Sequence, residues 1–454
     1  MMKKQFPSFM LVLIVLSMLL SACSTSPNPG DPTATPEPFF PATAEATSVA
    51  ILPINPTPTP NLNNPNPVRI TEIEYFQEDS QLIVMAKLFN TLDDAILRDV
   101  QLEVLALDAL GNRIAMERSS FRYLFPTETT ALVQNFDLIS GIEITNVEVR
   151  VIDGLIDRSL KYKQALTVSE ATAFPLEEGW NVSGWLKNSD PYTYTQVVLN
   201  AIAYNAAGQI VGGGREVYDF VPEKDEFGFT IPITSLPEQI VERVDVSPWI
   251  TSYSASLPGG NWWNSIEKVE WNFAVDRYNQ ITGGAILKNV TDQTLVETYA
   301  ILTVSDENNR VCYANHAYYD VILPKETVSY AVFPSQLPED CLASNVDLVI
   351  VPGEFANFPV EYNPLVVSQA AFVDEENVSL SVVNNLNSSI SQARVYVVIR
   401  NPDGRIVGGG FHNTEDIRSA SATSVLIPVA YLGDQNELSI FAFASLPADV
   451  HFGQ

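Results

Sequence analysis

Residues Val197–Gly214 read VVLNAIAYNAAGQIVGGG, and this stretch decides the predicted fold. Alternate positions from Val197 to Ala203 are apolar, whereas Asn200 belongs to the opposite face. Alternation with a period of two and one polar face predicts a strand of an antiparallel sheet that is packed on one side. The following Asn205–Gly208 predicts a tight hairpin turn, because an Asx side chain caps such a turn and glycine accepts a positive φ.

The same pattern occurs four times beyond residue 67, with a period of 95 to 101 residues. Each copy has a strand-like run that ends in an asparagine, and an Asp or Asn follows 17 or 18 residues later. A Gly or Asn comes three residues after that, and a proline follows in the first three copies. The positions are Asn90, Asn188, Asn289 and Asn384; Asp108, Asn205, Asp306 and Asn401; Gly111, Gly208, Asn309 and Gly404; and Pro126, Pro222 and Pro324.

When the copies are aligned on this turn, the strand before it has one apolar face in every copy. The apolar positions are Val100/Leu102/Val104/Ala106, Val197/Leu199/Ala201/Ala203, Thr298/Ala300/Leu302/Val304 and Ala393/Val395/Val397/Ile399. The other face is mixed and is expected to be in contact with water; it includes Gln101, Glu103, Asn200, Thr303, Arg394 and Arg400. Several short strands per copy, with almost no helical periodicity, predict small β-sandwiches.

We therefore predict an all-β protein, a tandem array of four small antiparallel β-sandwich domains after a signal peptide and a disordered tether. The predicted segments are 1–22 (signal peptide), 23–67 (anchor and tether), 68–155, 160–250, 265–354 and 360–454 (sandwiches), and 251–264 (an aromatic linker).

The start of the chain predicts export and a lipid anchor. Two lysines, Lys3 and Lys4, precede a run of roughly 12 apolar residues, which suits an export signal and is too short to span a bilayer comfortably. The end of this run, Leu20-Ser21-Ala22-Cys23, resembles the lipobox of bacterial lipoproteins. The resemblance implies cleavage before Cys23, a diacylglyceryl group on its sulfur and a place on the extracytoplasmic side of a membrane. The alternative is an ordinary export signal with an incidental cysteine.

Composition limits the partners. The segment from Ser24 to Pro67 is rich in Pro, Thr, Asn and Ala and predicts an extended tether. The chain has 54 acidic and 25 basic residues, a formal net charge of −29. This excess of acid argues against nucleic acid as a partner, since such partners need clustered Lys and Arg. The membrane is expected to be reached through the lipid anchor, and an envelope protein or an extracellular polymer remains as a further partner.

The turn regions resemble the FxLYD-type domain and related immunoglobulin-like modules of bacterial surface lipoproteins. The resemblance is carried by Ala201-Ile202-Ala203-Tyr204-Asn205-Ala206-Ala207-Gly208-Gln209-Ile210-Val211-Gly212 and less exactly by Leu105–Gly111. The fourth copy matches in the turn but has Arg400 in place of the aromatic residue, and the third has Ser305 there. The family has no general activity, so the resemblance implies a fold and no functional residue.

Cys312 and Cys341 are left once Cys23 is assigned to the anchor. Outside the cytoplasm such a pair is expected to form a disulfide, the alternative being two buried thiols. Closing a loop of about 30 residues would contribute roughly 3–4 kcal/mol in the chain-entropy model.

Catalytic motifs are not found. The three histidines, His316, His412 and His451, show no zinc-ligand spacing, and neither a nucleophile elbow nor a calcium loop occurs. We expect no cofactor, no metal and no enzymatic activity. The triplets Gly212–Gly214 and Gly408–Gly410 are not followed by a phosphate-binding helix, so we interpret them as bulges or close backbone approaches.

Tryptophans gather between residues 249 and 271, where copies two and three are expected to meet. One interpretation is packing of the junction between domains. The other is a sugar- or peptide-binding platform with Trp249, Trp262 and Trp263 as ligand contacts, because exposed rings stack on apolar ligand faces. The leading hypothesis for function is a non-catalytic envelope lipoprotein that scaffolds or binds outside the membrane. The alternative is an accessory ligand-binding lipoprotein of a transport or polymer-degrading system.

Overall fold

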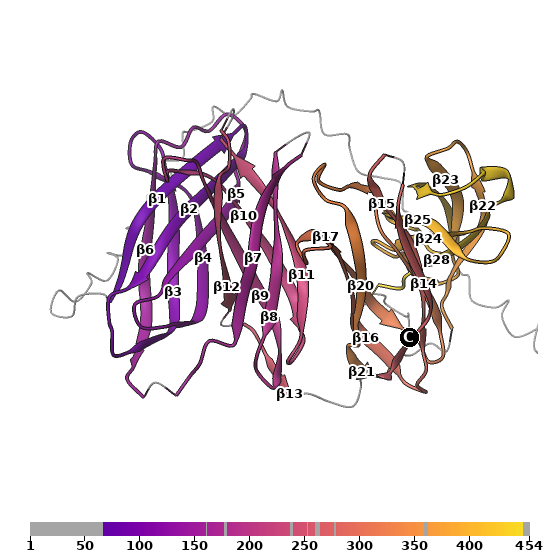
Figure 1. Ribbon diagram of the computed structural model, residues 1–454, viewed down its shortest axis with the longest axis horizontal. Helices are drawn as coiled ribbons and strands as arrows, with labels where there is room; N and C mark the ends of the chain where they lie inside the picture. Colours follow the sequence, from indigo (N-terminus) through magenta and orange to yellow (C-terminus); the bar gives the residue numbers. More distant parts are fainter. Residues whose placement is uncertain are drawn as a thin grey trace, which may run out of the picture. The chain divides into compact units, whose positions relative to one another are not determined.

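The computed structural model describes residues 67–159, 161–176, 179–236, 239–251, 253–258, 264–276, 278–357 and 362–447. The chain divides into two units, 1–63 and 64–454, and every described residue belongs to the second unit. This part is built of antiparallel β-strands and contains no α-helix (Figure 1). It has no helix long and apolar enough to cross a membrane. The predicted all-β fold is confirmed.

The first sandwich consists of two three-stranded sheets, which we name by the order of their strands. The 1-2-5 sheet contains its first, second and fifth strands: β1 (Val68–Glu78), β2 (Gln81–Asn90) and β5 (Thr129–Asp137). The 4-3-6 sheet contains its fourth, third and sixth strands: β4 (Arg113–Leu124), β3 (Ile96–Leu107) and β6 (Asn146–Asp157).

The other three sandwiches repeat this strand order, although in the second the fourth and fifth strands also pair briefly, so that its two sheets are continuous. The 1-2-5 sheets are β7 (Leu166–Pro175), β8 (Trp180–Asn188) and β11 (Glu226–Ser235); β14 (Ile266–Val275), β15 (Gln280–Asn289) and β18 (Thr327–Ala331); and β22 (Leu365–Phe372), β23 (Asn377–Asn384) and β26 (Ser421–Pro428). The 4-3-6 sheets are β10 (Ile210–Val221), β9 (Tyr192–Tyr204) and β12 (Arg243–Ile250); β17 (Val311–Ile322), β16 (Thr294–Asp306) and β20 (Ala343–Val351); and β25 (Ile406–Asn413), β24 (Arg394–Arg400) and β28 (Ser439–Ala444). Short strands extend them: β13 (Ser256–Pro258), β19 (Ser335–Gln336), β21 (Glu354–Ala356) and β27 (Ala430–Tyr431).

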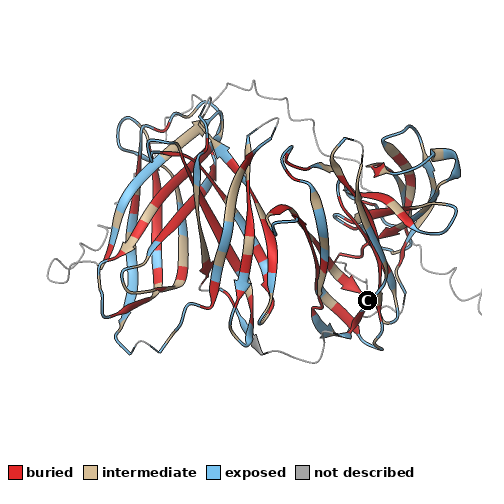
Figure 2. Ribbon diagram, in the orientation of Figure 1, coloured by how far each residue is buried: buried red, intermediate tan, exposed pale blue. Residues whose placement is uncertain are grey.

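The predicted apolar face of the third strand forms the core of each sandwich. Its sixteen positions, four per copy, are buried, and none is more than 1% exposed. Figure 2 shows buried, intermediate and exposed segments along the strands by colour, and β3 is buried without a break from Leu102 to Leu107. Burial of apolar surface contributes about 25 cal/mol per Å² removed from water, so this repeated face supplies a core to each sandwich.

The predicted hairpin turns are confirmed in all four copies. In the second, Asn205 Oδ1 accepts hydrogen bonds from the backbone N–H groups of Ala207 and Gln209, both at 3.0 Å. Gly208 has a φ of +77°. In the third copy Asn309 takes this conformation with a φ of +66°, which asparagine tolerates better than most residues.

The strand-ending asparagines have a role that the sequence pattern did not reveal. Each is 0% exposed and lies where the second strand ends. Asn188 Nδ2 donates to the carbonyl oxygens of Tyr192 at 2.8 Å and Val221 at 3.2 Å, and its Oδ1 accepts from Asp190 N at 3.0 Å. Asn90, Asn289 and Asn384 make the corresponding three kinds of bond. Each asparagine therefore joins the loop after its strand to the end of the fourth strand or the turn after it.

One expectation about the third strand is wrong. Its second face was predicted to be in water, but in the second copy Asn200 and Ile202 are 0% exposed, and Thr303 of the third copy is 4% exposed. The reason is that the 1-2-5 sheet of each sandwich packs on the 4-3-6 sheet of the next. In the first copy, before which no sandwich is described, Gln101 of this face is exposed, although Glu103 and Leu105 are 9% and 4% exposed.

Hydrogen bonds cross the first two of these interfaces. Asn200 Oδ1 accepts from Val133 N at 3.1 Å between the first and second sandwiches. Gly228 N donates to Thr303 Oγ1 at 2.9 Å between the second and third. The oxygens of these two side chains are thus satisfied by backbone N–H groups of the neighbouring sheet, which lowers the cost of burying them, whereas Asn200 Nδ2 is buried without a hydrogen-bond partner in the described structure.

The third interface is more polar at its edge. The Arg400 guanidinium lies 2.6 Å from a carboxylate oxygen of Glu270, and Asn272 Nδ2 donates to Ile406 O at 2.7 Å. Tyr396 and Val398 of the fourth sandwich belong to the apolar cluster that forms the core of the third. The three consecutive interfaces therefore have the same arrangement, in which the 1-2-5 sheet of one sandwich packs on the 4-3-6 sheet of the next.

The glycine triplets lie where backbones approach closely, as predicted. A Cβ on Gly214 would meet the Pro232 carbonyl oxygen at 2.0 Å within the second sandwich. A Cβ on Gly213, which points the other way, would meet Met85 Cγ of the first sandwich at 2.8 Å. In the fourth copy Gly410 approaches Pro428 O and Gly409 approaches Ala331 of the third sandwich. The middle glycine of each triplet thus leaves room for the preceding sandwich. A neighbouring glycine leaves room for the opposite sheet of the same sandwich.

The predicted linker 251–264 is partly a strand. Ser256–Pro258 form β13, which pairs with Tyr192–Tyr194 of β9. Residues 252 and 259–263 lie outside the described part of the chain.

Candidate functional site

A cleft of about 600 Å³ lies between the second and third sandwiches. One wall comes from β7 and β8, and the other from the start of β17 and the segment that precedes β20. The lining residues are Thr172, Ala173, Phe174, Pro175, Leu176, Ser183, Arg310, Val311, Cys312, Gln336, Leu337, Pro338, Glu339 and Asp340. Apolar and polar groups are mixed in this lining, which suits a small ligand or a short peptide segment.

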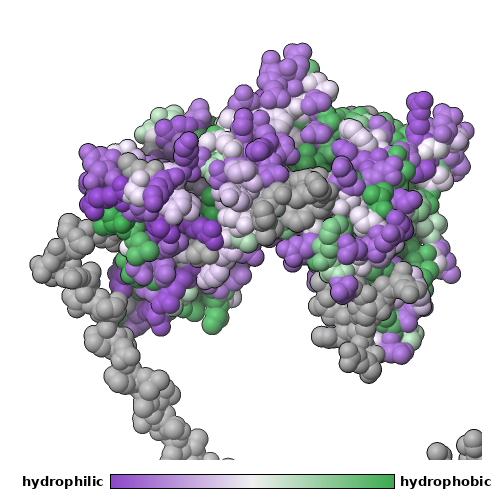
Figure 3. All heavy atoms as spheres, turned by 90° about the horizontal axis from the view of Figure 1, so that it is seen from below, coloured by the Kyte–Doolittle hydropathy of each residue, from purple (hydrophilic) through white to green (hydrophobic). Residues whose placement is uncertain are grey.

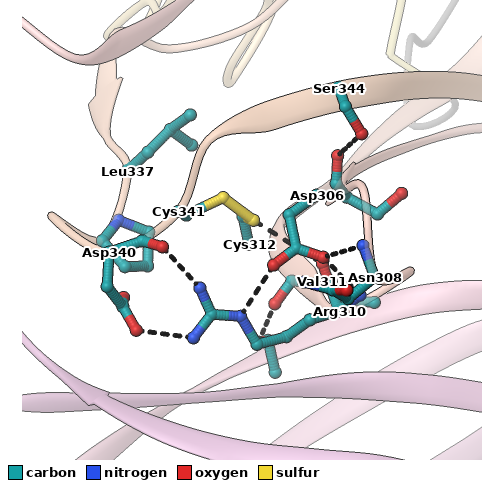
Figure 4. Close-up of a disulfide and its surroundings, with 12 residues drawn as sticks. Asp306, Asn308, Arg310, Val311, Cys312, Leu337, Asp340, Cys341 and Ser344 are labelled. Carbon is teal, nitrogen blue, oxygen red and sulfur yellow. Dashed lines mark hydrogen bonds and ion pairs between the residues drawn. A yellow bond between two sulfur atoms is a disulfide. The ribbon is translucent and has the colours of Figure 1, made fainter.

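A disulfide between Cys312 and Cys341 stabilises one wall of the cleft (Figure 4). The predicted disulfide is confirmed, and the two residues are 2% and 1% exposed. It links the start of β17 to the turn that carries Pro338, whose carbonyl oxygen accepts a 3.0 Å hydrogen bond from Cys341 N. The wall is therefore fixed covalently at the point where the cleft opens.

Arg310 is the cation of the cleft, and it is paired with two carboxylates and with the backbone carbonyl oxygen of Asp340. Its guanidinium lies 2.6 Å from Asp340 and 3.2 Å from Asp306. Hydrogen bonding to Asp340 is the main factor that raises the pKa of Arg310, and the same bond lowers the pKa of Asp340. Because its charge is already paired, Arg310 is positioned to order the wall of the cleft, and an anionic ligand would have to displace a carboxylate.

The lining lacks the geometry of a nucleophile beside a base. The Ser183 hydroxyl donates to the Val311 carbonyl oxygen, so its proton is held by a backbone acceptor. Within the described ranges no group of three or more His, Cys, Asp or Glu side chains gathers around a metal-sized space. The chemistry that this arrangement offers is binding by shape, with hydrogen bonds from backbone and side chain.

Trp249 is not an exposed ligand-binding ring, which corrects one of the predicted contacts. It lies on β12, is 5% exposed, and packs against Phe121 of the first sandwich with ring centroids 4.5 Å apart. Of the two interpretations of the tryptophan cluster, packing between domains is right for Trp249. The junction is that of the first and second sandwiches, although the second and third were expected. Trp262 and Trp263 lie outside the described residues, and Trp271 on β14 is 41% exposed.

The anchor cannot be placed in the structure. Cys23, the predicted signal peptide and the predicted tether up to residue 66 lie outside the described residues, so lipidation remains a prediction from the lipobox resemblance.

His316 lies at the interface between the second and third sandwiches. Its ring contacts Tyr218 at a centroid distance of 4.3 Å, and burial lowers the pKa of His316 to about 3. Its Nε2 is buried without a hydrogen-bond partner in the described structure. The sequence offered no signal for this position, because the ring faces a sheet nearly 100 residues earlier in the chain.

On the face shown in Figure 3, hydrophilic side chains predominate and hydrophobic ones form separate patches. This distribution is ordinary for a water-exposed surface.

No protein-family model matches the chain, and no curated protein matches it. Among solved structures it is similar to Escherichia coli alpha-2-macroglobulin in its native conformation, with 12% identity, 83% of this chain and 28% of that chain covered, and a TM-score of 0.11. Salmonella alpha-2-macroglobulin reacted with methylamine gives 11% identity, 83% and 28% coverage, and a TM-score of 0.14. The chain thus spans less than a third of the length of either protein. These TM-scores are too low to transfer any property of those proteins to this chain.

Proposed function

We propose that this protein is a non-catalytic, lipid-anchored array of β-sandwiches that holds a binding surface outside the membrane. The observation that carries the proposal is the repeated interface, in which the 1-2-5 sheet of one sandwich packs on the 4-3-6 sheet of the next three times in succession. Independent domains on flexible linkers would not bury the same face of the third strand in the second, third and fourth sandwiches. An array of this kind suits a spacer or scaffold that presents its last domain at a fixed orientation.

The anchor is tested by metabolic labelling with a palmitate analogue. Labelling at Cys23 is expected in the natural chain, and Cys23→Ala should lose the label and leave the membrane fraction. The Cys312→Ala/Cys341→Ala chain serves as control and should keep both. A Cys23→Ala protein that stays labelled and membrane-bound would contradict the anchor.

The fixed orientation is tested by spin labels in the first and fourth sandwiches. Leu110 is 85% exposed and Asp403 is also exposed, so cysteines there can carry the labels. We expect a single narrow distance distribution between them. Gly213→Trp, which puts a ring where Met85 lies, should broaden the distribution by opening the first interface. A broad distribution without that substitution would rule out a rigid array.

The cleft supports a second candidate function, binding of a small extracellular ligand. Two walls from different sandwiches and a disulfide-fixed rim make a hollow of about 600 Å³ that such a ligand could enter. Titration with peptidoglycan fragments and short oligosaccharides tests this. Leu176→Trp, at a 37% exposed lining residue, should abolish binding, whereas Leu110→Trp in the first sandwich should not. If no fragment binds the natural chain, this candidate function is wrong.

A further inference from the structure

The 1-2-5 sheet of the fourth sandwich has an outward face that no described residue covers. Its residues are small or aliphatic and none is charged, in a chain with 54 acidic residues. They are Val366, Ser368, Ala371, Ser379, Ser381, Val383, Ala422, Ser424 and Leu426. Leu426 is 54% exposed and Val366 is 47% exposed. We call these residues the fourth 1-2-5 face.

The corresponding faces of the first three sandwiches are all covered. Five positions before the strand-ending asparagine, the second strand carries Met85, Ser183 and Gly284 in turn, and Ser379 in the fourth copy. Met85 is 2% exposed and Ser183 is 1% exposed. A Cβ on Gly284 would meet Val398 of the next sandwich at 3.0 Å. Uncharged residues at this centre, two of the three of them small, thus lie on faces that another sheet covers.

What covers each face is the 4-3-6 sheet of the next sandwich, centred on three residues paired across its strands. In the second, third and fourth copies these trios are Asn200/Arg215/Ser247, Ile301/His316/Val349 and Tyr396/Phe411/Phe443. Ile301 joins the apolar cluster of the second sandwich, and Tyr396 and Phe443 join that of the third. The Ser247 hydroxyl accepts a 3.0 Å hydrogen bond from Ala131 N of the first sandwich. Each trio brings either apolar surface or a hydrogen-bonding group to the face that it covers.

The first sandwich carries charges at all three of these positions. Its trio is Glu103/Arg118/Arg150. Arg118 lies 3.3 Å from Glu103, and Arg150 pairs with Glu148. Laying an uncharged sheet on this trio would strip water from Arg118, Arg150 and the neighbouring Glu148 and would offer no new partner to them or to Glu103, which is already only 9% exposed. A polar outer face of this kind is what terminates a repeat array. The array is therefore closed at its first sandwich and open at its fourth.

We propose that the fourth 1-2-5 face docks the sheet of a β-sandwich in another protein. At the centre of that sheet lies a 4-3-6-type trio of aromatic, β-branched or hydrogen-bonding residues. This trio has no like charges that repel one another. A second copy of this chain does not fit, because among the described residues the one 4-3-6 sheet that no other sandwich covers carries Glu103, Arg118 and Arg150. The inference rests on the proposed display function and gives it a docking surface.

In the test, substitutions in the first sandwich give this chain a sheet of the proposed kind, which a second copy can then dock on its fourth 1-2-5 face. Residues 64–454 are used, because all four cores and all three interfaces lie within this unit. Glu103→Ile/Arg118→His/Arg150→Val copies the third trio onto the first sandwich. Sedimentation velocity should show the natural unit as a monomer and the triple variant in concentration-dependent association at least about tenfold tighter.

Two further variants keep the test decisive. Glu103→Asn/Arg150→Ser copies the second trio, whose arginine Arg118 already matches, and as a milder change it guards against misfolding of the triple variant. Adding Ser381→Arg to either variant places a charge on the fourth 1-2-5 face and should abolish association. The control, Leu342→Arg at an 81% exposed site of the third sandwich, should leave association intact.

Two results would overturn the proposal. Folded variants of both kinds that sediment like the natural unit would show that the fourth 1-2-5 face does not accept such a sheet. Association of the natural unit that Ser381→Arg abolishes would make a second copy the occupant. Neither result affects palmitate labelling at Cys23 or the distance between spin labels, so failure here is distinguishable from failure of the proposed function.

Discussion

Trp249 of the second sandwich donates its indole N–H to Thr130 Oγ1 of the first, at 2.8 Å. The two residues are 119 positions apart, on β12 and β5. The indole belongs to the same apolar cluster as the core of the first sandwich, so this sandwich is completed by a side chain from its neighbour. Loss of the interface should therefore lower the stability of the sandwich as well as loosen the array.

Trp249→Ala should destabilise the first sandwich by about 3–5 kcal/mol, since it leaves a cavity and an unpaired Thr130 hydroxyl. Hydrogen exchange at the β3 amides around Leu102 reports the local free energy of opening. Trp271→Ala is the matched control. Because Trp271 is 41% exposed, its removal should cost about 1 kcal/mol or less and leave β3 unaffected. Equal protection of β3 in the Trp249→Ala and natural chains would contradict this role.

Asn188→Asp should destabilise the second sandwich by at least about 3 kcal/mol at neutral pH. The change removes the Nδ2 donor from two buried carbonyl oxygens and places a charge at a site that is 0% exposed. Asn205→Asp makes the same chemical change in the exposed hairpin turn, where the first and third copies already have Asp108 and Asp306. Asn205→Asp should therefore leave the stability of the second sandwich nearly unchanged. Thermal unfolding of the two variants side by side checks the contrast, and similar shifts would refute it.

Gly214→Ala should cost more than Gly213→Ala, although the two residues are adjacent. The new Cβ at Gly214 would lie 2.0 Å from a backbone oxygen that belongs to the opposite sheet and cannot move alone. We expect about 3 kcal/mol or more. At Gly213 the obstacle is the flexible Met85 side chain, so about 1 kcal/mol is expected, and Met85→Ala should recover most of it. A Gly213→Ala defect that Met85→Ala leaves unchanged would mean that the clash lies elsewhere.

The interface between the second and third sandwiches should weaken as the pH falls below about 6.5. Burial holds the pKa of His316 at about 3 in the folded chain, so between these two values only the unfolded chain binds the proton. The contribution of His316 to stability is therefore fully present above the pKa that the histidine has in the unfolded chain, and it is lost as the pH falls. Tyr218 and Phe227, which face the ring, offer it no counter-charge.

Because His316 as a whole residue is of intermediate burial, we expect a slope of about 0.5–1.4 kcal/mol per pH unit between pH 6 and 5. Chemical denaturation at the two pH values measures the slope. His316→Phe, which has Phe411 as its counterpart in the fourth sandwich, should remove this contribution. An unchanged slope in His316→Phe would assign the pH dependence to other groups.

The core and the turns could be predicted from the sequence because both depend on neighbours along the chain. Alternation from Val197 to Ala203 places those side chains on one face of any extended strand. Asn205 and Gly208 close a turn through bonds within five residues. The same local signals recur in all four copies, which made the repeat visible.

The outer face of the third strand was predicted wrongly for a physical reason. Asn200 and Thr303 are polar, and polarity in a strand usually indicates solvent. Here each side chain accepts a hydrogen bond from a backbone N–H of the preceding sandwich, at Val133 and Gly228. A residue's own chemistry does not distinguish a water partner from a backbone partner that comes from 67 or 75 residues earlier.

The sequence by itself determined the all-β fold, the repeated sandwich, the hairpin turns and the pairing of the two cysteines, because periodicity, turn chemistry and redox compartment act locally or by count. Tertiary structure alone decided which faces meet, where Trp249 packs, and that the first trio is charged while the fourth 1-2-5 face is open. Those features depend on contacts between sheets that lie far apart in the chain. Only the packed structure brings them together and shows which face no described residue covers.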